Sequence, residues 1–590
     1  MPKAPFLIRP NKFTGYVADP SSAPPEKLSY PSVNCMINEN GEVEQRLGTT
    51  VEDIDLNQAN KSARSFYSEK YDVVVFTVGT VVKYYDFNDS SVYDTGLTLT
   101  DGTICRGDWF EGDLYITNTT DGARRLVFGR LRGDATAASA NLNIDYDMAA
   151  RLERFGKTSG NVVIQGTAEA FTGASTSNGR VTGTNLSQNY SDNAVCVVVH
   201  DISGVTGIEK WSKIFFWKRR LGGIGSEVAG NSDQPNNTAY YGKFAAPTSL
   251  EDTIVFDYAT GGSTRELVGN YGRLTNVVPA QDYLWQLTDR EAYVTAASSV
   301  TISGSGIGTT TPDIRDPDHG CFNEDCATTL GSGEFSYIDA AAKRIMRGKI
   351  ATNAGAAVPY VDDSYDMPIR SELQGMDLDQ TGAIAYQWKG GRMTIHQVKV
   401  NGQFKWYIHD KRINDWQPPQ QVITASSFFE RKGVLYATDA EDDTVYSIFT
   451  SFADDGNSIN CEIWTGELSI GDAMIREAQA TGIITQAANV KLRSYVTNMN
   501  GGRRTGSEKS VDGSTFSYDP NKSIGTLPVG TGSATPTTES YARWKITWDV
   551  FPSEGHTVQV GVTQDMEGGY FRLSTLQISG KYADSYTPSQ

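Results

Sequence analysis

A short phrase that recurs along the chain constrains the fold most: one or two aromatic residues, a polar turn, and a strand ending in Tyr or Val. Clear copies occupy residues 109–129 (WFEGDLYITNTTDGARRLVFG) and 428–450 (FFERKGVLYATDAEDDTVYSIFT), and looser copies occupy 283–295 and 386–409. Each copy reads as a strand, a tight turn and a second strand. Hairpins repeated over hundreds of residues, with almost no helix between them, indicate a β-propeller or a similar repeat array.

Length and composition agree with this interpretation. A chain of 590 residues is too long for one compact core, so we expect several domains. The 58 glycines supply turns, and 29 tyrosines together with many Thr and Val residues favour strands over helices. We therefore predict an all-β protein with an irregular β-propeller body, an inserted small domain and a C-terminal β-sandwich.

Shifts in composition along the chain predict where these parts lie. The first 32 residues are rich in proline and lack periodicity, which is typical of an extended arm. A stretch dominated by Gly, Ser, Thr, Asn and Ala contains one of the few helical candidates, at 148–156. The predicted division is an N-terminal arm at 1–32, first propeller strands at 33–130, an inserted domain or extension at 131–210, the remainder of the propeller at 211–454, and a sandwich or jelly-roll-like region at 455–590.

Charge and cysteine content narrow the class of protein. The net charge of −18 argues against a basic face that grips nucleic acid, but it suits an acidic surface that DNA slides past. The first 15 residues contain no apolar core of a secretory signal, and no run of about 18 apolar residues predicts a membrane span. Six cysteines, mostly far apart in the sequence, indicate free thiols made in a reducing compartment.

The segment HGCFNEDC is the nearest approach to a metal site. His319, Cys321 and Cys326 resemble part of a zinc knuckle, but a structural zinc site needs four ligands and no second Cys or His pair follows. An ordinary loop is the favoured interpretation. The chain also lacks a phosphate-binding GxxxxGK[ST] loop, a GxSxG nucleophile elbow and an HExxH helix. We therefore predict no catalytic, cofactor-binding or metal-binding residues and no enzymatic activity.

Each of three charged stretches has both a structural and a functional interpretation. The acidic run 439–443 is typical of a solvated hairpin turn, with a calcium site or catalytic carboxylates as alternatives. Asp316 and Asp318 match the start of an EF-hand loop, but Ala327 stands where the bidentate Glu belongs. The basic, aromatic stretch 215–225 favours a strand and a glycine turn with solvated arginines over a phosphate contact.

Several phrases together resemble the tail nozzle, or hub, proteins of short-tailed bacteriophages. The segment NCMINENGEVEQRLGTT resembles the opening hairpin of that family, with Asn34, Gly41, Arg46 and Gly48 at the matching positions. Leu47 departs from the more usual Arg-Pro-Gly, and residues 131–210 have no counterpart. Further resemblance follows in order along the chain at 213–250, 272–295 and 454–472.

This resemblance implies a structural virion protein. Six copies would form a ring below the portal and the tail adaptor, around a channel that retains and later releases the genome. DNA would pass without specific binding, and peripheral loops and the C-terminal sandwich would dock fibres or spikes. Assembly would take place in the host cytoplasm, with no cofactor and no catalysis.

Two other classes remain open on the sequence alone. One is a receptor- or carbohydrate-binding tail protein, such as a tailspike or a propeller lectin, with or without glycoside cleavage; a bacterial adhesion propeller is the other. Abundant Trp and Tyr could stack on sugars, but they are also typical of blade cores. We expect Trp109, Trp285, Trp388 and Phe429 to wedge between neighbouring sheets.

Overall fold

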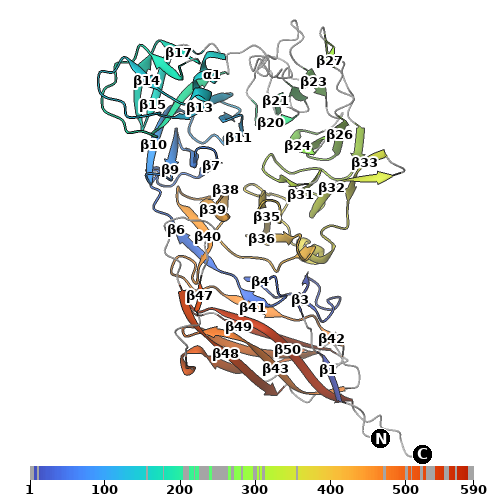
Figure 1. The fold of residues 1–590 in the computed structure, drawn as a ribbon. Helices are drawn as coiled ribbons and strands as arrows, with labels where there is room; N and C mark the ends of the chain where they lie inside the picture. Colours follow the sequence, from blue (N-terminus) through green and yellow to red (C-terminus); the bar gives the residue numbers. More distant parts are fainter. Residues whose placement is uncertain are drawn as a thin grey trace, which may run out of the picture.

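The computed structural model is an all-β molecule with a propeller at one end and a β-sandwich at the other (Figure 1). Within the described residues no helix is long and apolar enough to cross a membrane. The described residues are 5–8, 12–154, 157, 159–176, 178–202, 211–217, 220–224, 238–241, 264–267, 272–280, 283–296, 302–303, 306–307, 313–331, 333–353, 356–469, 473–497, 503–505, 508–517, 523–525, 538–549, 557–564, 566 and 568–582.

Seven antiparallel sheets, counted over the described strands, follow one another around the propeller (Figure 1). Most are simple meanders, as the recurring hairpin phrase predicts. In chain order, blade 1 holds β7 (Ala63–Ser68), β8 (Val73–Val78), β9 (Val81–Asp86) and β10 (Ser91–Thr98); blade 2 holds β11 (Arg106–Phe110), β12 (Asp113–Thr117), β13 (Arg124–Arg130) and β19 (Val195–Asp201); blade 3 holds β20 (Lys213–Trp217), β21 (Arg220–Ile224), β22 (Thr238–Tyr241) and β23 (Thr264–Leu267); blade 4 holds β24 (Leu274–Ala280), β25 (Tyr283–Thr288), β26 (Ala292–Ala296) and β29 (Asp313–Asp316), with β27 (Ile302–Ser303) and β28 (Gly306–Ile307) forming a small hairpin between the last two; blade 5 holds β30 (Ala327–Gly331), β31 (Glu334–Asp339), β32 (Arg344–Asn353) and β33 (Ala356–Asp362); blade 6 holds β34 (Ile384–Trp388), β35 (Met393–Val400), β36 (Gln403–Asp410) and β37 (Asp415–Trp416); and blade 7 holds β38 (Ala425–Arg431), β39 (Val434–Asp439), β40 (Val445–Ser451) and β6 (Gly48–Val51).

The first strand of each blade is the inner one, and these strands form a closed circle. β7 lies against β11, the contact repeats from blade to blade, and β38 of blade 7 returns to β7. The ring is closed by an early segment of the chain, because β6 supplies the outer strand of blade 7 through antiparallel pairing with β40. A strand from one end of the array therefore ties the last blade to the rest of the ring. The prediction of an all-β propeller is confirmed.

The lower body is a sandwich of two antiparallel sheets whose inner faces share one apolar core. The first sheet holds β1 (Pro5–Ile8), β4 (Cys35–Ile37), β5 (Val43–Gln45), β43 (Ala473–Thr485), β47 (Ser523–Gly525), β48 (Thr538–Asp549) and β50 (Phe571–Tyr582). The second holds β41 (Cys461–Trp464), β42 (Leu468–Ser469), β44 (Asn489–Thr497), β45 (Arg503–Thr505), β46 (Lys509–Asp512) and β49 (Thr557–Gln564), with the short 3₁₀ turn η5 (Gly513–Thr515) after β46.

The structure divides the first 62 residues differently from the sequence prediction. β1 pairs with β50, and the hairpin of β4 and β5 joins the sandwich sheet through β50, so neither belongs to a free arm or to the first propeller strands. A parallel pair, β2 (Gly15–Val17) and β3 (Lys27–Ser29), contacts blade 6, the 3₁₀ turn η4 (Met367–Ile369) and the short helix α2 (Arg370–Leu373) that follows it. These strands are three or four residues long, too short to show the alternation on which strand prediction depends.

An insertion interrupts blade 2 between β13 and β19. It contains β14 (Asn141–Asn143), α1 (Tyr146–Arg154), β15 (Gly160–Ile164), β16 (Thr167–Phe171), β17 (Gly173–Ser175) and β18 (Arg180–Thr182). Met148 and Leu152 of α1 pack with Ile164 and Val181 in a separate buried cluster. β15 pairs with β19, so the insertion extends the sheet of blade 2 outward.

Large aromatic residues fill the spaces between neighbouring blades, as predicted. Trp109 packs 5.1 Å from Phe128 and 6.3 Å from Tyr71 of blade 1, and Trp285 packs 4.9 Å from Phe335 of blade 5, measured between ring centroids. Two further contacts join blade 7 to its neighbours: Trp388 with Phe449 at 5.4 Å, and Phe429 with Tyr67 at 6.0 Å. The recurring aromatic residues are thus inter-blade wedges.

Candidate functional site at the propeller axis

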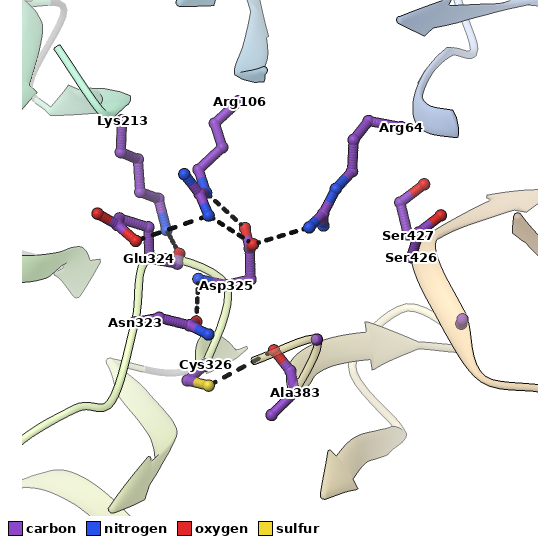
Figure 2. Close-up of polar contacts among 12 residues, drawn as sticks. Arg64, Arg106, Lys213, Asn323, Glu324, Asp325, Cys326, Ala383, Ser426 and Ser427 are labelled. Carbon is purple, nitrogen blue, oxygen red and sulfur yellow. Dashed lines mark hydrogen bonds and ion pairs between the residues drawn. The ribbon is translucent and has the colours of Figure 1, made fainter. Parts of the chain in front are cut away.

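Inner strands of the propeller begin at the same end of the axis, and their first residues converge there. Arg64 is the second residue of β7, and Arg106 and Lys213 are the first residues of β11 and β20. Figure 2 shows these three cations, from three consecutive blades, pointing toward one loop. Three long basic side chains in one buried region require acidic partners.

Asp325 is the common partner of the two arginines. Its Oδ1 and Oδ2 accept hydrogen bonds from Nε and Nη2 of Arg106, each 2.9 Å long, and Nη2 of Arg64 lies 3.2 Å from Oδ2 (Figure 2). Asp325 comes from the loop that leads into blade 5, whereas the arginines belong to blades 1 and 2. In a ring of seven blades, blade 5 lies opposite blades 1 and 2, so the ion pairs cross the propeller axis.

The loop that carries Asp325 is fixed by main-chain hydrogen bonds. Nζ of Lys213 donates to the carbonyl of Glu324 at 2.7 Å and to Oδ1 of Asn276 at 2.8 Å. The amide of Ala385, in blade 6, donates to the carbonyl of Asp325 at 2.9 Å. Five blades and this loop thus meet at one end of the axis, which holds Asp325 in a defined position.

Electrostatics at the cluster favour the fully charged state. Burial alone would raise the pKa of Asp325, but Arg106 and Arg64 outweigh it and hold that pKa well below its usual range. Burial lowers the pKa of Arg64 and of Lys213, and the nearby carboxylate of Asp325 opposes that shift in both. The charged members of the cluster therefore depend on one another.

A cavity of about 240 Å³ adjoins the cluster, lined by Arg64, Arg106, Lys213, Tyr386 and Ser427 among others. Two of its lining residues, Cys105 and Ser427, carry potential nucleophiles. Burial raises the pKa of Cys105, which keeps the sulfur a thiol. Oγ of Ser427 accepts a hydrogen bond from the amide of Ser65 at 2.8 Å and lies 2.7 Å from Oγ1 of Thr438, an arrangement that supplies no general base. The geometry is suited to joining blades across the axis.

The loop singled out in the sequence as HGCFNEDC is the one that enters the axis, but its important residue is Asp325. Cys321 and Cys326 are buried free thiols, and the Cys326 thiol donates to the carbonyl of Ala383 at 3.5 Å. Nδ1 of His319 lies 2.9 Å from Oδ2 of Asp316, one residue that the EF-hand comparison had named. No group of three metal-ligating side chains occurs in the described part of the chain.

The other charged stretches lie in turns or strands. The run 439–443 connects β39 and β40, where Oδ1 of Asp439 accepts from the amide of Glu441 at 2.7 Å and Oδ2 of Asp443 accepts from that of Gln58 at 2.8 Å. The basic stretch 215–225 spans the end of β20 and β21; of its side chains, those of residues 218–220 lie outside the described set.

Sequence reasoning missed the axial cluster, although a signal for it exists. A cation stands two or three positions before an aromatic residue at the start of three inner strands, in Arg64–Phe66, Arg106–Trp109 and Lys213–Phe215. A cation therefore recurs near the start of the inner strand in three successive blades. Unrelated surface charges would not show this periodicity.

Fold and site together define a seven-bladed β-propeller whose axis is crossed by ion pairs and which is joined to a β-sandwich. No known protein family profile and no curated protein sequence matches this chain. Similar solved structures include the WD40 domain of SCAP from fission yeast, 6% identical with a TM-score of 0.29 over 68% of this chain and 98% of that one. They also include an exo-β-1,3-galactanase from Phanerochaete chrysosporium, 7% identical with a TM-score of 0.23 over 62% and 94%, and a luciferin-regenerating enzyme, 9% identical with a TM-score of 0.24 over 68% and 95%. Identities and scores this low transfer no activity, and the propeller assignment rests on the strand pairing within this chain.

Proposed function

We propose that this chain is a structural virion protein of a phage tail. As nozzle or hub subunits, six copies would form a ring below the portal and adaptor, and the ring would enclose the DNA exit channel. The observation that carries the proposal is the closed axis. Asp325 bridges to Arg64 and Arg106 across the propeller, so a single copy offers no wide passage along its own axis. A channel for DNA would therefore lie between copies, with each propeller serving as a solid wall element.

The acidic net charge of the chain supports a channel that lets DNA pass without binding it. The chain carries 70 acidic against 52 basic residues. Phosphates are attracted by lysine and arginine clusters and repelled by carboxylates, so an acidic wall lets DNA slide. Three basic residues, Arg64, Arg106 and Lys213, are held at the axial cluster by Asp325 and by the carbonyl of Glu324.

Rigidity is the second support. A ring that holds back a packaged genome needs subunits that do not deform. In this chain β6 closes the propeller, and the preceding strands β4 and β5 pair within the sandwich, so one short segment is built into both bodies. The sandwich and the insertion at blade 2 project from the propeller (Figure 1) and offer surfaces for the adaptor, fibres or spikes.

Buried tryptophans weaken the carbohydrate-binding alternative. Stacking on sugars needs exposed aromatic faces. Of the tryptophans whose side chains the structure describes, Trp109 is half-buried and all others are buried: Trp211, Trp217, Trp285, Trp388, Trp406, Trp416, Trp464 and Trp544.

Electron microscopy of the purified chain with its portal and adaptor tests the proposal. The expected particle is a ring of six copies with an axial hole, whose lumen wall carries more Asp and Glu than Lys and Arg. A particle that stays monomeric or trimeric and cleaves polysaccharide would contradict the proposal, and so would a ring with a basic lumen.

A further inference from the structure

A second cavity, of about 290 Å³, lies where the sandwich meets blades 6 and 7, and we call it the junction pocket. Its volume is near the lower end of ligand-binding pockets, roughly 300–1,000 Å³. Three parts of the molecule line it: the β4–β5 hairpin of the sandwich, the turn before β35 in blade 6, and strands β39 and β40 of blade 7. The lining residues used below are Met36, Glu39, Glu44, Gln45, Trp388, Lys389, Arg392, Arg412 and Phe449.

The floor of the junction pocket is apolar and aromatic. Met36 packs against the buried cluster that contains Trp388, and the ring of Trp388 lies 5.4 Å from that of Phe449 between centroids. Two polar atoms in this buried lining lack a hydrogen-bond partner in the described structure: Nε1 of Trp388, whose residue is 3% exposed, and Oε1 of Gln45, whose residue is 1% exposed. Buried polar atoms are normally paired, so these two mark incompletely satisfied positions in the pocket lining.

The rim is cationic. Arg46, Lys389, Arg392 and Arg412 line the pocket, against two carboxylates, Glu39 and Glu44. Arg46 is engaged by Asp454 and Arg412 by Asp410, and burial raises the pKa of Glu44. Lys389 and Arg392 are therefore the cations left to receive an anion, with Glu39 as the carboxylate that pairs with Arg392.

Lys389 is the cation best placed to receive an anion. Its ammonium lies 4.3 Å from the ring centroid of Trp388, and no carboxylate within ion-pair distance of it occurs among the described residues. Burial and the nearby charges of Arg412 and Arg392 lower its pKa. Arg392, by contrast, pairs with exposed Glu39 at 2.5 Å, a contact that a competing carboxylate can replace.

We propose that the junction pocket binds an organic anion, a carboxylate carried on an apolar aryl or alkyl group. The carboxylate contacts Lys389 and Arg392 at the rim, and the apolar part packs on Trp388 and Phe449. Such an anion comes either from a free small molecule or from an acidic residue beside an apolar one in a partner's peptide segment. The pocket touches both bodies, so its occupant joins the sandwich to blades 6 and 7. This inference does not depend on a role in a phage tail.

Calorimetric titration of the full-length chain tests the proposal with four probes. Phenylbutyrate represents the free anion, and phenylbutyramide is its neutral counterpart; an acetylated Leu-Phe-Glu amide represents the peptide source, with the Leu-Phe-Gln amide as its neutral counterpart. We expect one of the two anions to bind, its neutral counterpart to bind at least about tenfold more weakly, and binding to weaken as salt rises. The anion that binds identifies the source.

Lys389→Met and Arg392→Met are the matched variants, because both side chains are exposed and methionine keeps their apolar stems. Each should weaken anion binding about tenfold, as expected for a lost charge-assisted hydrogen bond. Lys545→Met, an exposed lysine in the sandwich strand β48, should leave it unchanged. The proposal is overturned if neither anion binds up to about 10 mM, if the neutral counterparts bind equally well, or if both pocket variants bind like the wild type.

Discussion

Arg46 and Asp454 form a paired ion contact between the two chain segments that connect the sandwich to the propeller. Nη1 of Arg46 donates to Oδ1 of Asp454 at 2.7 Å, Nη2 donates to Oδ2, and the arginine side chain is completely buried. Arg46 lies between β5 and β6, and Asp454 between β40 and β41. Nε of Arg46 also donates to Oδ1 of Asn34 at 3.1 Å, so two residues of the family resemblance meet in this contact.

Replacing Arg46 with Met should strongly destabilise the protein. The substitution leaves Asp454 without its cation and removes one of the two donors to Oδ1 of Asn34 in a largely buried site, which costs about 3–5 kcal/mol. In scanning calorimetry we expect a lower melting temperature and separate transitions for propeller and sandwich. Arg493→Met is the control, since Arg493 pairs with Glu508 at the surface of the sandwich, where ion pairs contribute about 0–1 kcal/mol. Equal effects of the two substitutions would contradict the role given to Arg46.

Asp325→Asn should weaken the propeller rather than the sandwich. The amide keeps the shape of the side chain but leaves Arg64 without its negative partner and Arg106 with only the more distant Glu324, 3.6 Å from its Nη2, at a cost of about 3–5 kcal/mol. Hydrogen exchange should show faster opening of blades 1, 2 and 5, with the strands of the sandwich unchanged. Asp53→Asn, an exposed site, serves as the control with an expected change within about 0.5 kcal/mol. Uniform protection in the Asp325 variant would refute the axial bridge.

Acid should loosen the closure between blades 7 and 1. Arg431 ends β38 and binds Asp72 in the turn after β7, with Nε and Oδ1 2.6 Å apart. Burial tends to raise the pKa of Asp72, but hydrogen bonds from Arg431 and Tyr67 lower it to about 2. Because the folded pKa lies below the unfolded value of about 3.9, the stabilisation is complete above that pH and disappears as pH falls toward about 2.

Unfolding titrations of the wild type and of Asp72→Asn measure this effect. We expect a difference in the free energy of unfolding of about 1–2 kcal/mol at pH 6, reduced from the full linkage value because Asp72 is partly exposed. The difference should shrink to near zero at about pH 2. A difference that stays constant with pH would show that Asp72 acts through something other than its charge.

All six cysteines should resist alkylation in the native protein. Each is buried, and burial raises the pKa of the Cys321 thiol to about 12, so neither access nor thiolate is available near pH 8. A thiol reagent should label the chain only after unfolding in denaturant, and then at six sites. Rapid labelling of the native protein, or fewer than six sites after unfolding without reductant, would contradict the buried free thiols.

The fold could be predicted from the sequence wherever the pattern was local. Alternation, turn residues and spaced aromatics such as Trp285 and Phe429 identified blades and their wedges, and 148–156 overlaps the observed α1, Tyr146–Arg154. The ring closure was beyond such reasoning. β6 is a four-residue strand, Gly48–Val51, and its partner β40 lies about 400 positions later in the chain.

The axial cluster was out of reach for a similar reason. Arg64, Arg106 and Asp325 each look like an ordinary surface charge in their own segment, and their meeting depends on the number of blades between them. The cysteines of HGCFNEDC drew attention to the correct loop, but as candidate metal ligands. The residue that matters is Asp325, which lies between them and pairs with arginines of distant blades.

The placement of the first fifty residues has a consequence for how the chain is made. β5 and β6 leave the ribosome early, yet their pairing partners β50 and β40 are synthesised much later. The last propeller blade cannot be completed before β40 is made, and the first sandwich sheet cannot be completed before β50 is made. Contacts of such long sequence separation form slowly. A cut at any single linker would also leave an unfinished sheet edge in at least one fragment, so the propeller and the sandwich are separate in space but inseparable in assembly.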